Sequence, residues 1–200
     1  LTVLSVATAF VIFGLLQGFM LGFHELVENN PDEHLQVVNR TMSAGLFTLP
    51  ISHARAIEQM EGVASVVTIT WFSGYFQEPT KPVGGFAIAD IGFLSENSEF
   101  YQIEPGIYAD FERLRTGAIV GRELALEHGW EVGDQVPVVG PPKADGTDAW
   151  FLDIVGLWHN DTQEFEARQV ILHFDFVEEG RAAMKGQVAN LIVLADGSLP

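Results

Sequence analysis

Hydrophobic and polar positions divide the chain into an uncharged apolar segment and a longer segment of mixed pattern. Residues 1–23 contain no Lys, Arg, Asp or Glu, and only Thr2, Ser5, Thr8 and Gln17 among them are appreciably polar. A helix of this length covers roughly 34 Å at ~1.5 Å per residue, enough for a hydrocarbon core of about 30 Å. A buried helix of a soluble protein rarely stays apolar on every face over such a length. The pattern therefore predicts a transmembrane helix over residues 1–23.

Three glycines recur every four residues in this segment, at Gly14, Gly18 and Gly22. Residues at this spacing share one helix face, and small side chains there let two backbones approach closely in a membrane. We expect this face to pack against another span of the same polypeptide or against a second subunit. The alternative is that glycine is simply common in such helices.

The character of the chain changes after Phe23, because residues 24–200 carry the whole net charge of −17. Such an acidic domain repels phosphate backbones and anionic lipid headgroups, which argues against nucleic-acid binding and against a basic membrane-surface module. The absence of cysteine removes disulfides and thiolate nucleophiles. We expect a water-soluble extracytoplasmic domain.

Strand and helix patterns alternate along this domain. Strands are predicted at 35–40, 63–76, 83–90, 117–121, 135–139, 150–158, 169–174 and 187–194, and helices at 50–62, 108–115, 123–128 and 176–186. The two strands around the Pro-Pro-Lys-Ala-Asp-Gly turn at 141–146 predict a hairpin. The order predicts an α+β fold in which two β-α-β lobes flank an inserted β-rich lobe. We further expect Gly129 to end a helix in the left-handed conformation, and Gly133-Asp134 to form a tight turn.

Several motifs carry a family resemblance. They are LSVA at 4–7 with FGL at 13–15, IEQMEGVASV at 57–66, and the run from GAIVG at 117–121 through GW at 129–130 and VGDQV at 132–136 to IVG at 154–156. In order and spacing these motifs resemble the first transmembrane helix and the periplasmic core domain of ABC-transporter permeases of the MacB/FtsX-like family. The likeness covers nearly the whole chain.

The resemblance implies an organisation and a function. It implies a porter-like lobe formed by residues 24–90 and 168–200, with an inserted β-rich lobe at 91–167. It implies a permease subunit in the bacterial cytoplasmic membrane that helps to export or translocate a drug, peptide or lipoprotein, with three more apolar spans expected beyond Pro200. The implied partners are a cytosolic ABC ATPase, a second permease copy or paralogue, and a periplasmic adaptor or lipoprotein. ATP would bind to the partner ATPase, and this chain lacks the G-x-x-x-x-G-K-[ST] phosphate-binding motif.

Aromatic side chains crowd the predicted strand at 63–76. Because a strand alternates its faces, Trp71, Phe72, Tyr75 and Phe76 cannot all be buried on one side. We name Trp71, Tyr75 and Phe76 as candidates for substrate or partner contact, although a strand buried on both faces explains the pattern equally well. The same alternatives apply to Trp150, Phe151 and Trp158.

Candidate catalytic groups form no recognisable motif. The six histidines show no H-x-x-x-H or H-E-x-x-H spacing, and no G-x-S-x-G elbow surrounds a serine. Acidic pairs occur at Asp32-Glu33, Glu164/Glu166 and Glu178-Glu179. We therefore predict no catalytic, cofactor or metal site and no enzymatic activity. Two alternatives stay open, namely a single-span membrane-anchored binding module and a membrane-anchored hydrolase whose dispersed carboxylates converge in one pocket with a perturbed pKa.

Overall fold

The computed structural model describes residues 34–39, 48–161 and 166–196, together with Phe10, Phe13, Gly14 and Gln17. The chain divides into two compact units, 1–35 and 36–200. In the first unit the four separately described residues are helical. The rest of the predicted transmembrane helix, with Gly18 and Gly22, lies outside the described residues, so the span and its glycine packing stay predictions. No helix among the described residues has the length and apolar character needed to cross a bilayer.

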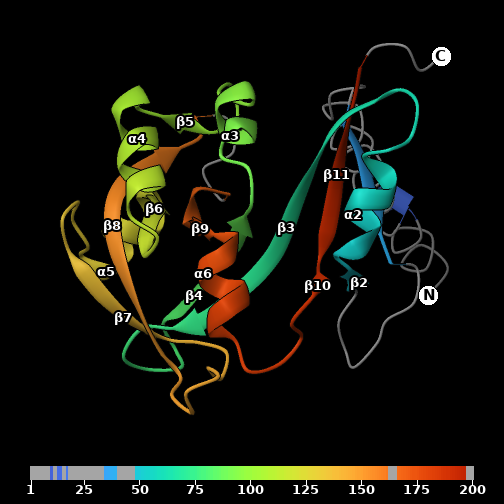
Figure 1. The fold of residues 1–200 in the computed structure, drawn as a ribbon. Helices are drawn as coiled ribbons and strands as arrows, with labels where there is room; N and C mark the ends of the chain where they lie inside the picture. The colour runs from blue at the N-terminus through green and yellow to red at the C-terminus, as the bar shows by residue number, and fades with distance from the viewer. Residues whose placement is uncertain are drawn as a thin grey trace, which may run out of the picture. The chain divides into compact units, whose positions relative to one another are not determined.

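A mixed sheet of nine strands organises the described residues from His34 onward (Figure 1). Its order is β1–β11–β3–β4–β9–β6–β8–β5, and β7 lies beside both β3 and β8. These strands are β1 (His34–Val38), β3 (Val63–Tyr75), β4 (Pro82–Ile88), β5 (Gln102–Ile103), β6 (Gly117–Gly121), β7 (Gln135–Val139), β8 (Ala149–His159), β9 (Gln169–His173) and β11 (Asn190–Ala195). A second, two-stranded sheet pairs β2 (Leu49–Pro50) with β10 (Gln187–Val188).

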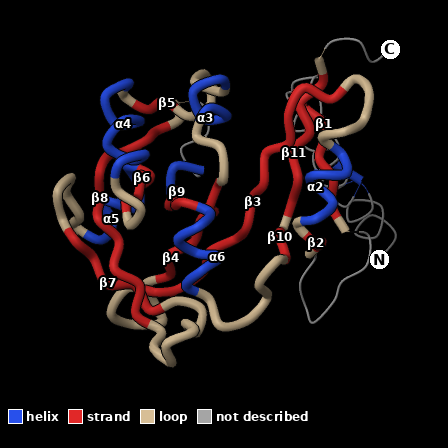
Figure 2. The backbone as a smooth tube through the Cα atoms, in the orientation of Figure 1, coloured by secondary structure: helices blue, strands red, loops and turns tan. Residues whose placement is uncertain are grey.

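Short helices connect and cover the strands (Figure 2). They are α2 (Ser52–Ile57), α3 (Gly92–Glu96), α4 (Pro105–Arg113), α5 (Arg122–His128) and α6 (Phe174–Gly180), with a 3-10 turn at Glu166–Arg168. The predicted hairpin is confirmed, because β7 and β8 pair antiparallel around the 141–146 turn. Hydrogen bonding is continuous from β4 through β9 to β6, so it joins the segments predicted as separate lobes. The lobe boundaries stay a prediction.

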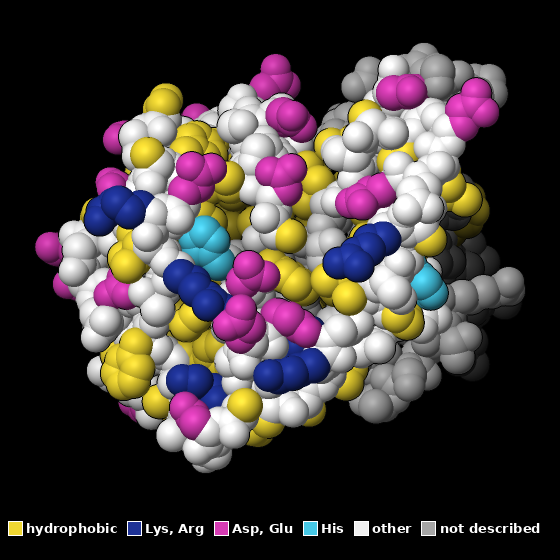
Figure 3. Space-filling model, viewed as in Figure 1, with side chains coloured by type: hydrophobic (Ala, Val, Ile, Leu, Met, Phe, Trp, Pro, Cys, Tyr) yellow, Lys and Arg dark blue, Asp and Glu magenta, His cyan; other side chains and the backbone are white. Residues whose placement is uncertain are grey.

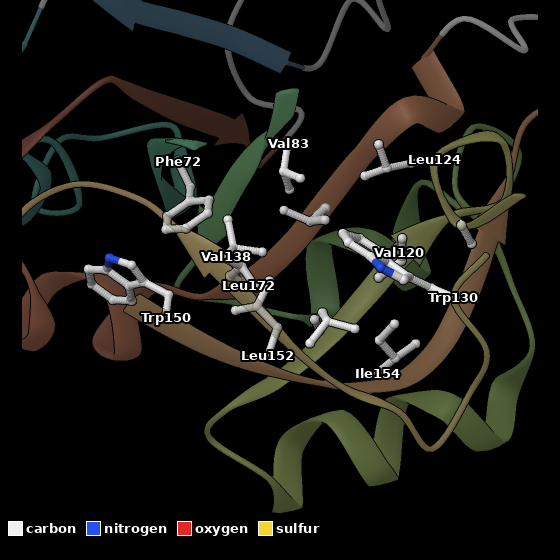
Figure 4. Close-up of a cluster of buried hydrophobic side chains, with 14 of the residues drawn as sticks. Phe72, Val83, Val120, Leu124, Trp130, Val138, Trp150, Leu152, Ile154 and Leu172 are labelled. Atoms are coloured by element: carbon white, nitrogen blue, oxygen red, sulfur yellow. The ribbon is translucent and has the colours of Figure 1, made fainter. Parts of the chain in front are cut away.

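The long strand β3 ties the hydrophobic clusters together. Val67 and Ile69 lie in one cluster with Phe111 and Trp158, and Phe72 lies in another with Trp150. Figure 4 shows the second cluster, in which Phe72 stands beside Trp150 with their ring centroids 5.5 Å apart in an edge-to-face arrangement. Four consecutive residues at 67–70 are buried, because both faces of the strand are covered there.

Two of the glycine predictions are confirmed. Gly129 ends α5 in the left-handed conformation, at φ 68° and ψ 36°, and the N–H of Trp130 bonds back to the carbonyl of Ala125 at 2.9 Å. Gly133 has a φ of 100°, and the N–H of Asp134 donates to the carbonyl of Glu131 at 3.1 Å. Both positions therefore use backbone conformations that glycine adopts without steric cost.

The structure corrects the predicted elements near the C-terminus. The helix predicted at 176–186 ends at Gly180, because Arg181 turns to an extended backbone at φ −67° and ψ 141°. The strand predicted at 187–194 is divided, since Gln187 and Val188 pair with β2 while Asn190 begins the pairing with β3. Elsewhere, the helix predicted at 50–62 is limited to Ser52–Ile57. The hydrophobic pattern does not predict α3 and β5, because both are too short to repeat an apolar period.

Candidate functional site

A groove of about 700 Å³ lies beside β3, and we call it the β3 groove. Trp71 and Ser73 of β3 form one side, and Pro141 and Pro142 of the β7–β8 turn form another. Arg181, just after α6, is the charged residue that lines it. Its exposed lining is mainly apolar, which is typical of sites that take hydrophobic side chains.

The three aromatic residues predicted as contact candidates occupy different environments. Trp71 is 58% exposed and lines the β3 groove, whereas its neighbour Phe72 is buried in the core. Tyr75 is half-buried and pairs with Val139 of β7. Phe76 is half-buried and lies 5.2 Å, between ring centroids, from Trp130. The structure therefore does not bring the three together, and their role in contact stays a prediction.

Aromatic residues of β8 show the alternation expected of a strand. Trp150 and Trp158 are fully buried, whereas Phe151 is 51% exposed. The indole N–H of Trp150 donates to the carbonyl of Pro141 at 2.9 Å, which joins the core to the groove wall. The two buried tryptophans are thus core residues.

The buried side chain of Arg181 forms a polar part of the groove lining, which no sequence motif predicts. Its side chain donates to the Glu178 carboxylate, to the carbonyl of Gln187 at 2.6 Å and to the hydroxyl oxygen of Thr70 at 3.3 Å. The other Glu178 oxygen accepts the N–H of Gly186 at 2.5 Å. The residue is only 8% exposed, and its Nε has no partner among the described residues. The spacing of Glu178 and Arg181, three residues apart, is the one sequence signal for this pair.

Backbone hydrogen bonds hold the turn of the hairpin against the end of α6. The N–H of Ala182 donates to the carbonyl of Pro142, and the N–H of Ala144 donates to the carbonyl of Gly180, both at 2.8 Å. The ammonium of Lys143 lies 5.5 Å from the ring centroid of Trp150, within cation–π range. These contacts fix two walls of the groove relative to each other.

A smaller cavity of about 370 Å³ lies beside Phe76, His128 and Trp130. Trp130 Nε1 and His128 Nε2 are buried and have no hydrogen-bond partner among the described residues. Two carboxylates also line this cavity. Glu127 forms an ion pair with Arg168 at 2.7 Å, and Asp134 accepts the N–H of Glu131 at 2.9 Å. Both carboxylates thus have partners that hold the local fold.

The described part of the chain contains no group of three or more His, Asp or Glu side chains placed to hold a metal ion. Hydrogen bonds from the hydroxyl and the N–H of Thr147 lower the pKa of Asp145. Burial raises the pKa of the Tyr108 hydroxyl. Neither residue lines either cavity, so these two shifts do not favour the hydrolase alternative.

The fold of this chain resembles those of two solved domains of ABC-type transport proteins. No protein-family model and no curated protein matches the sequence. The periplasmic region of MacB from Actinobacillus actinomycetemcomitans superposes with a TM-score of 0.58 and 12% identity, covering 84% of this chain and 77% of that one. The chain has the fold of that periplasmic domain. The extracellular domain of the noncanonic ABC-type transporter YknZ from Gram-positive bacteria superposes with a TM-score of 0.51 and 12% identity, covering 76% of this chain and 75% of that one. The MacB-like fold predicted from the motifs is therefore confirmed.

Proposed function

We propose that this chain is the extracytoplasmic domain, with the first membrane span, of a permease subunit of an ABC transporter. The domain transmits the motion of a cytosolic ATPase outward, so that a drug, peptide or lipoprotein is exported or translocated. One observation carries the proposal, namely the shared fold with the MacB periplasmic region over most of both chains. The extracellular domain of YknZ supports the same assignment.

The sheet provides a mechanical basis for this role. β3 is hydrogen-bonded to β11 along Val63–Ile69 and to β4 along Ile69–Tyr75. Its side chains enter separate hydrophobic clusters on either side of that change of partner. A displacement applied to β11 therefore reaches β4 through one continuous strand, since packed and hydrogen-bonded elements move as rigid bodies.

The division of labour follows from the same proposal. The partner ATPase binds ATP, and a second permease copy or paralogue completes the membrane part. This chain binds no cofactor and contributes contacts and motion, with no catalysis of its own. The domain lies outside the bacterial cytoplasmic membrane, where it meets a substrate, an adaptor or a lipoprotein.

Residues 1–200 contain no cysteine, so a cysteine introduced here reports the location of this domain in a full-length protein in which every other cysteine is replaced. In the full-length protein in intact cells, a membrane-impermeant maleimide is expected to label Glu61→Cys, because residue 61 is exposed. The matched control is Ala118→Cys, whose site is fully buried and is expected to react only after denaturation. Labelling of Glu61→Cys only in lysed cells would contradict an extracytoplasmic position.

Capture of the full-length protein from its own membranes tests the partner. We expect an ABC ATPase to co-purify in a fixed ratio, as shown by mass spectrometry. Extracytoplasmic labelling without any co-purifying ATPase contradicts the permease assignment and favours the single-span binding module.

A further inference from the structure

One edge of β3 has an open stretch between two neighbouring strands. On this edge β11 pairs with β3 as far as Ile69, and β7 joins it at Tyr75. The opposite edge is paired with β4 throughout Ile69–Tyr75. β10 lies close to β3 just before Ala189, but no described strand is hydrogen-bonded to this edge at 70–74. Trp71 and Ser73 in this stretch line the β3 groove.

The hydrogen bonds at the end of this stretch show which backbone groups face the groove. The carbonyl of Ile69 accepts the N–H of Ala189 at 2.9 Å on the open edge, whereas the carbonyl of Thr68 accepts the N–H of Ala89 at 3.2 Å on the β4 edge. Because the direction of backbone N–H and C=O groups alternates along a strand, odd-numbered residues face the open edge. The backbone N–H and C=O groups of Trp71 and Ser73 therefore point away from β4, toward the open edge.

The dimensions fit one short extended segment. Ile69 and Tyr75 are separated by about 20 Å of strand at ~3.3 Å per residue. The end of β11 bounds this open stretch at Ile69, and the end of β7 bounds it at Tyr75. The groove volume of about 700 Å³ and its apolar lining leave room for side chains beside the strand edge. On the face that Figure 3 shows, acidic and basic side chains are intermingled, and α6 packs on β3, β4 and β9.

We propose that the β3 groove docks an extended segment of a partner polypeptide, which adds a short strand between β11 and β7. A polypeptide backbone matches the alternating donors and acceptors of an unpaired strand edge, and such strand addition is a recurrent mode of peptide recognition. The side chains of the segment that lie against Trp71 are apolar, since that exposed indole supplies the cross-strand contact. This inference rests on the proposed function, because it assigns a place where the extracytoplasmic domain meets its protein partner.

The net charge of this chain indicates which residues the docked segment carries at its two ends. Among the described residues, the groove is lined by one cation, Arg181, whose charge is balanced by Glu178. The surrounding chain has a net charge of −17. A segment with Lys or Arg at its two ends is therefore attracted to the domain, whereas an acidic segment is repelled.

Hydrogen exchange measured by NMR on the full chain tests the open edge. The probe is the end-blocked peptide Lys-Val-Thr-Val-Lys, whose five residues match positions 70–74, N-methylated on the amides of one edge so that it cannot stack on itself. Without peptide, the amides of Trp71 and Ser73 are expected to exchange fast, and those of Phe72 and Gly74 slowly, because the latter two face β4. With saturating peptide, we expect exchange at Trp71 and Ser73 to slow by about tenfold or more. A tenfold slowing requires free peptide at about nine times its dissociation constant, because exchange then proceeds through the remaining tenth of unoccupied domains.

Two matched pairs isolate the backbone contribution. Ser73→Pro removes the N–H that faces the groove without breaking the ladder to β4, and is expected to weaken binding by about tenfold. Ser73→Ala keeps that N–H and is expected to bind like the unchanged chain. A peptide methylated on both edges has no donor to offer and is expected not to bind, a result that requires no protein variant.

Three results would overturn the inference. They are equal binding of the peptide methylated on both edges, no protection of Trp71 and Ser73 at saturating peptide, and protection that rises with protein concentration alone, which would assign the groove to a second copy of this chain. These results leave the proposed function to its own test, which is co-purification of the ATPase. If the ATPase co-purifies and no peptide protects the edge, only the docking inference fails; if the peptide binds and no ATPase is found, only the transporter role fails.

Discussion

Replacement of Arg181 by Met tests whether the buried ion pair holds the wall of the β3 groove. The change keeps an apolar stem of similar length and removes the guanidinium. It deletes the hydrogen bonds to Glu178, to the carbonyl of Gln187 and to Thr70. Glu178, whose side chain is 20% exposed, then keeps the N–H of Gly186 as a hydrogen-bond donor.

The expected cost follows from these contacts. Breaking a buried ion pair by removing one partner costs about 3–5 kcal/mol, because an uncompensated charge is left behind. Removal of the unpaired Nε of Arg181 offsets about 1 kcal/mol of that loss, since a buried donor without a partner is itself unfavourable. We therefore expect Arg181→Met to lower the free energy of unfolding by about 2–4 kcal/mol.

Urea denaturation of the chain, followed by tryptophan fluorescence, measures this change. The control is the double variant Arg181→Met with Glu178→Gln, in which the amide is neutral and still accepts the N–H of Gly186. It is expected to recover about 1–2 kcal/mol relative to Arg181→Met alone. A loss below about 1 kcal/mol in the single variant, or no recovery in the double variant, would refute the reasoning.

Three further predictions concern the fold around the two cavities. Gly129→Ala is expected to cost about 1–2 kcal/mol in urea denaturation, because residue 129 holds a left-handed backbone with open space around it. Trp150→Ala is expected to cost about 3–5 kcal/mol by the same measurement, whereas the exposed Trp71→Ala costs less than about 1 kcal/mol. Asp145 has a lowered pKa in the folded state, so its bonds to Thr147 add stability above the ordinary carboxyl range, and this stability is lost as pH falls through the folded pKa. An NMR titration of Thr147→Val is accordingly expected to show the pKa of Asp145 moved upward, and an unchanged value would contradict that cause.

Local patterns were sufficient to predict many elements of the fold. The β-branched run at β3 and the short apolar run at β6 lie within predicted strands. Gly129 marked the end of α5, because a left-handed residue ends a helix wherever the surrounding fold allows it. These features depend on neighbours along the chain and so are visible in sequence.

Tertiary contacts explain why the predicted helix through residue 186 and the predicted strand at 187–194 were wrong. The helix expected through 186 stops at Gly180 because the Arg181 side chain turns toward Thr70 and Gln187, and the backbone beside it meets the 141–146 turn. The strand expected at 187–194 splits because its first residues pair with β2. Short local patterns do not encode either partner.

The surroundings of the candidate contact residues also depend on distant parts of the chain, so the sequence predicts them only in part. The alternation of a strand predicts that some of its aromatic residues point outward, and Trp71 does so. That Tyr75 pairs with β7 and Phe76 packs on Trp130 depends on segments more than fifty residues away. Which edge of β3 stays open is likewise decided by where β11 and β7 end, and not by the residues of β3 themselves.

In the proposed transporter, motion driven by ATP reaches this domain. The most direct measurement places an environment-sensitive fluorophore on Glu61→Cys of the full-length protein, reconstituted in membranes with its co-purified ATPase. The account predicts that ATP changes the emission, and that vanadate trapping of the ATPase holds the changed signal. An identical spectrum without nucleotide, with ATP and after trapping would contradict it, because the domain would then not follow the ATPase cycle.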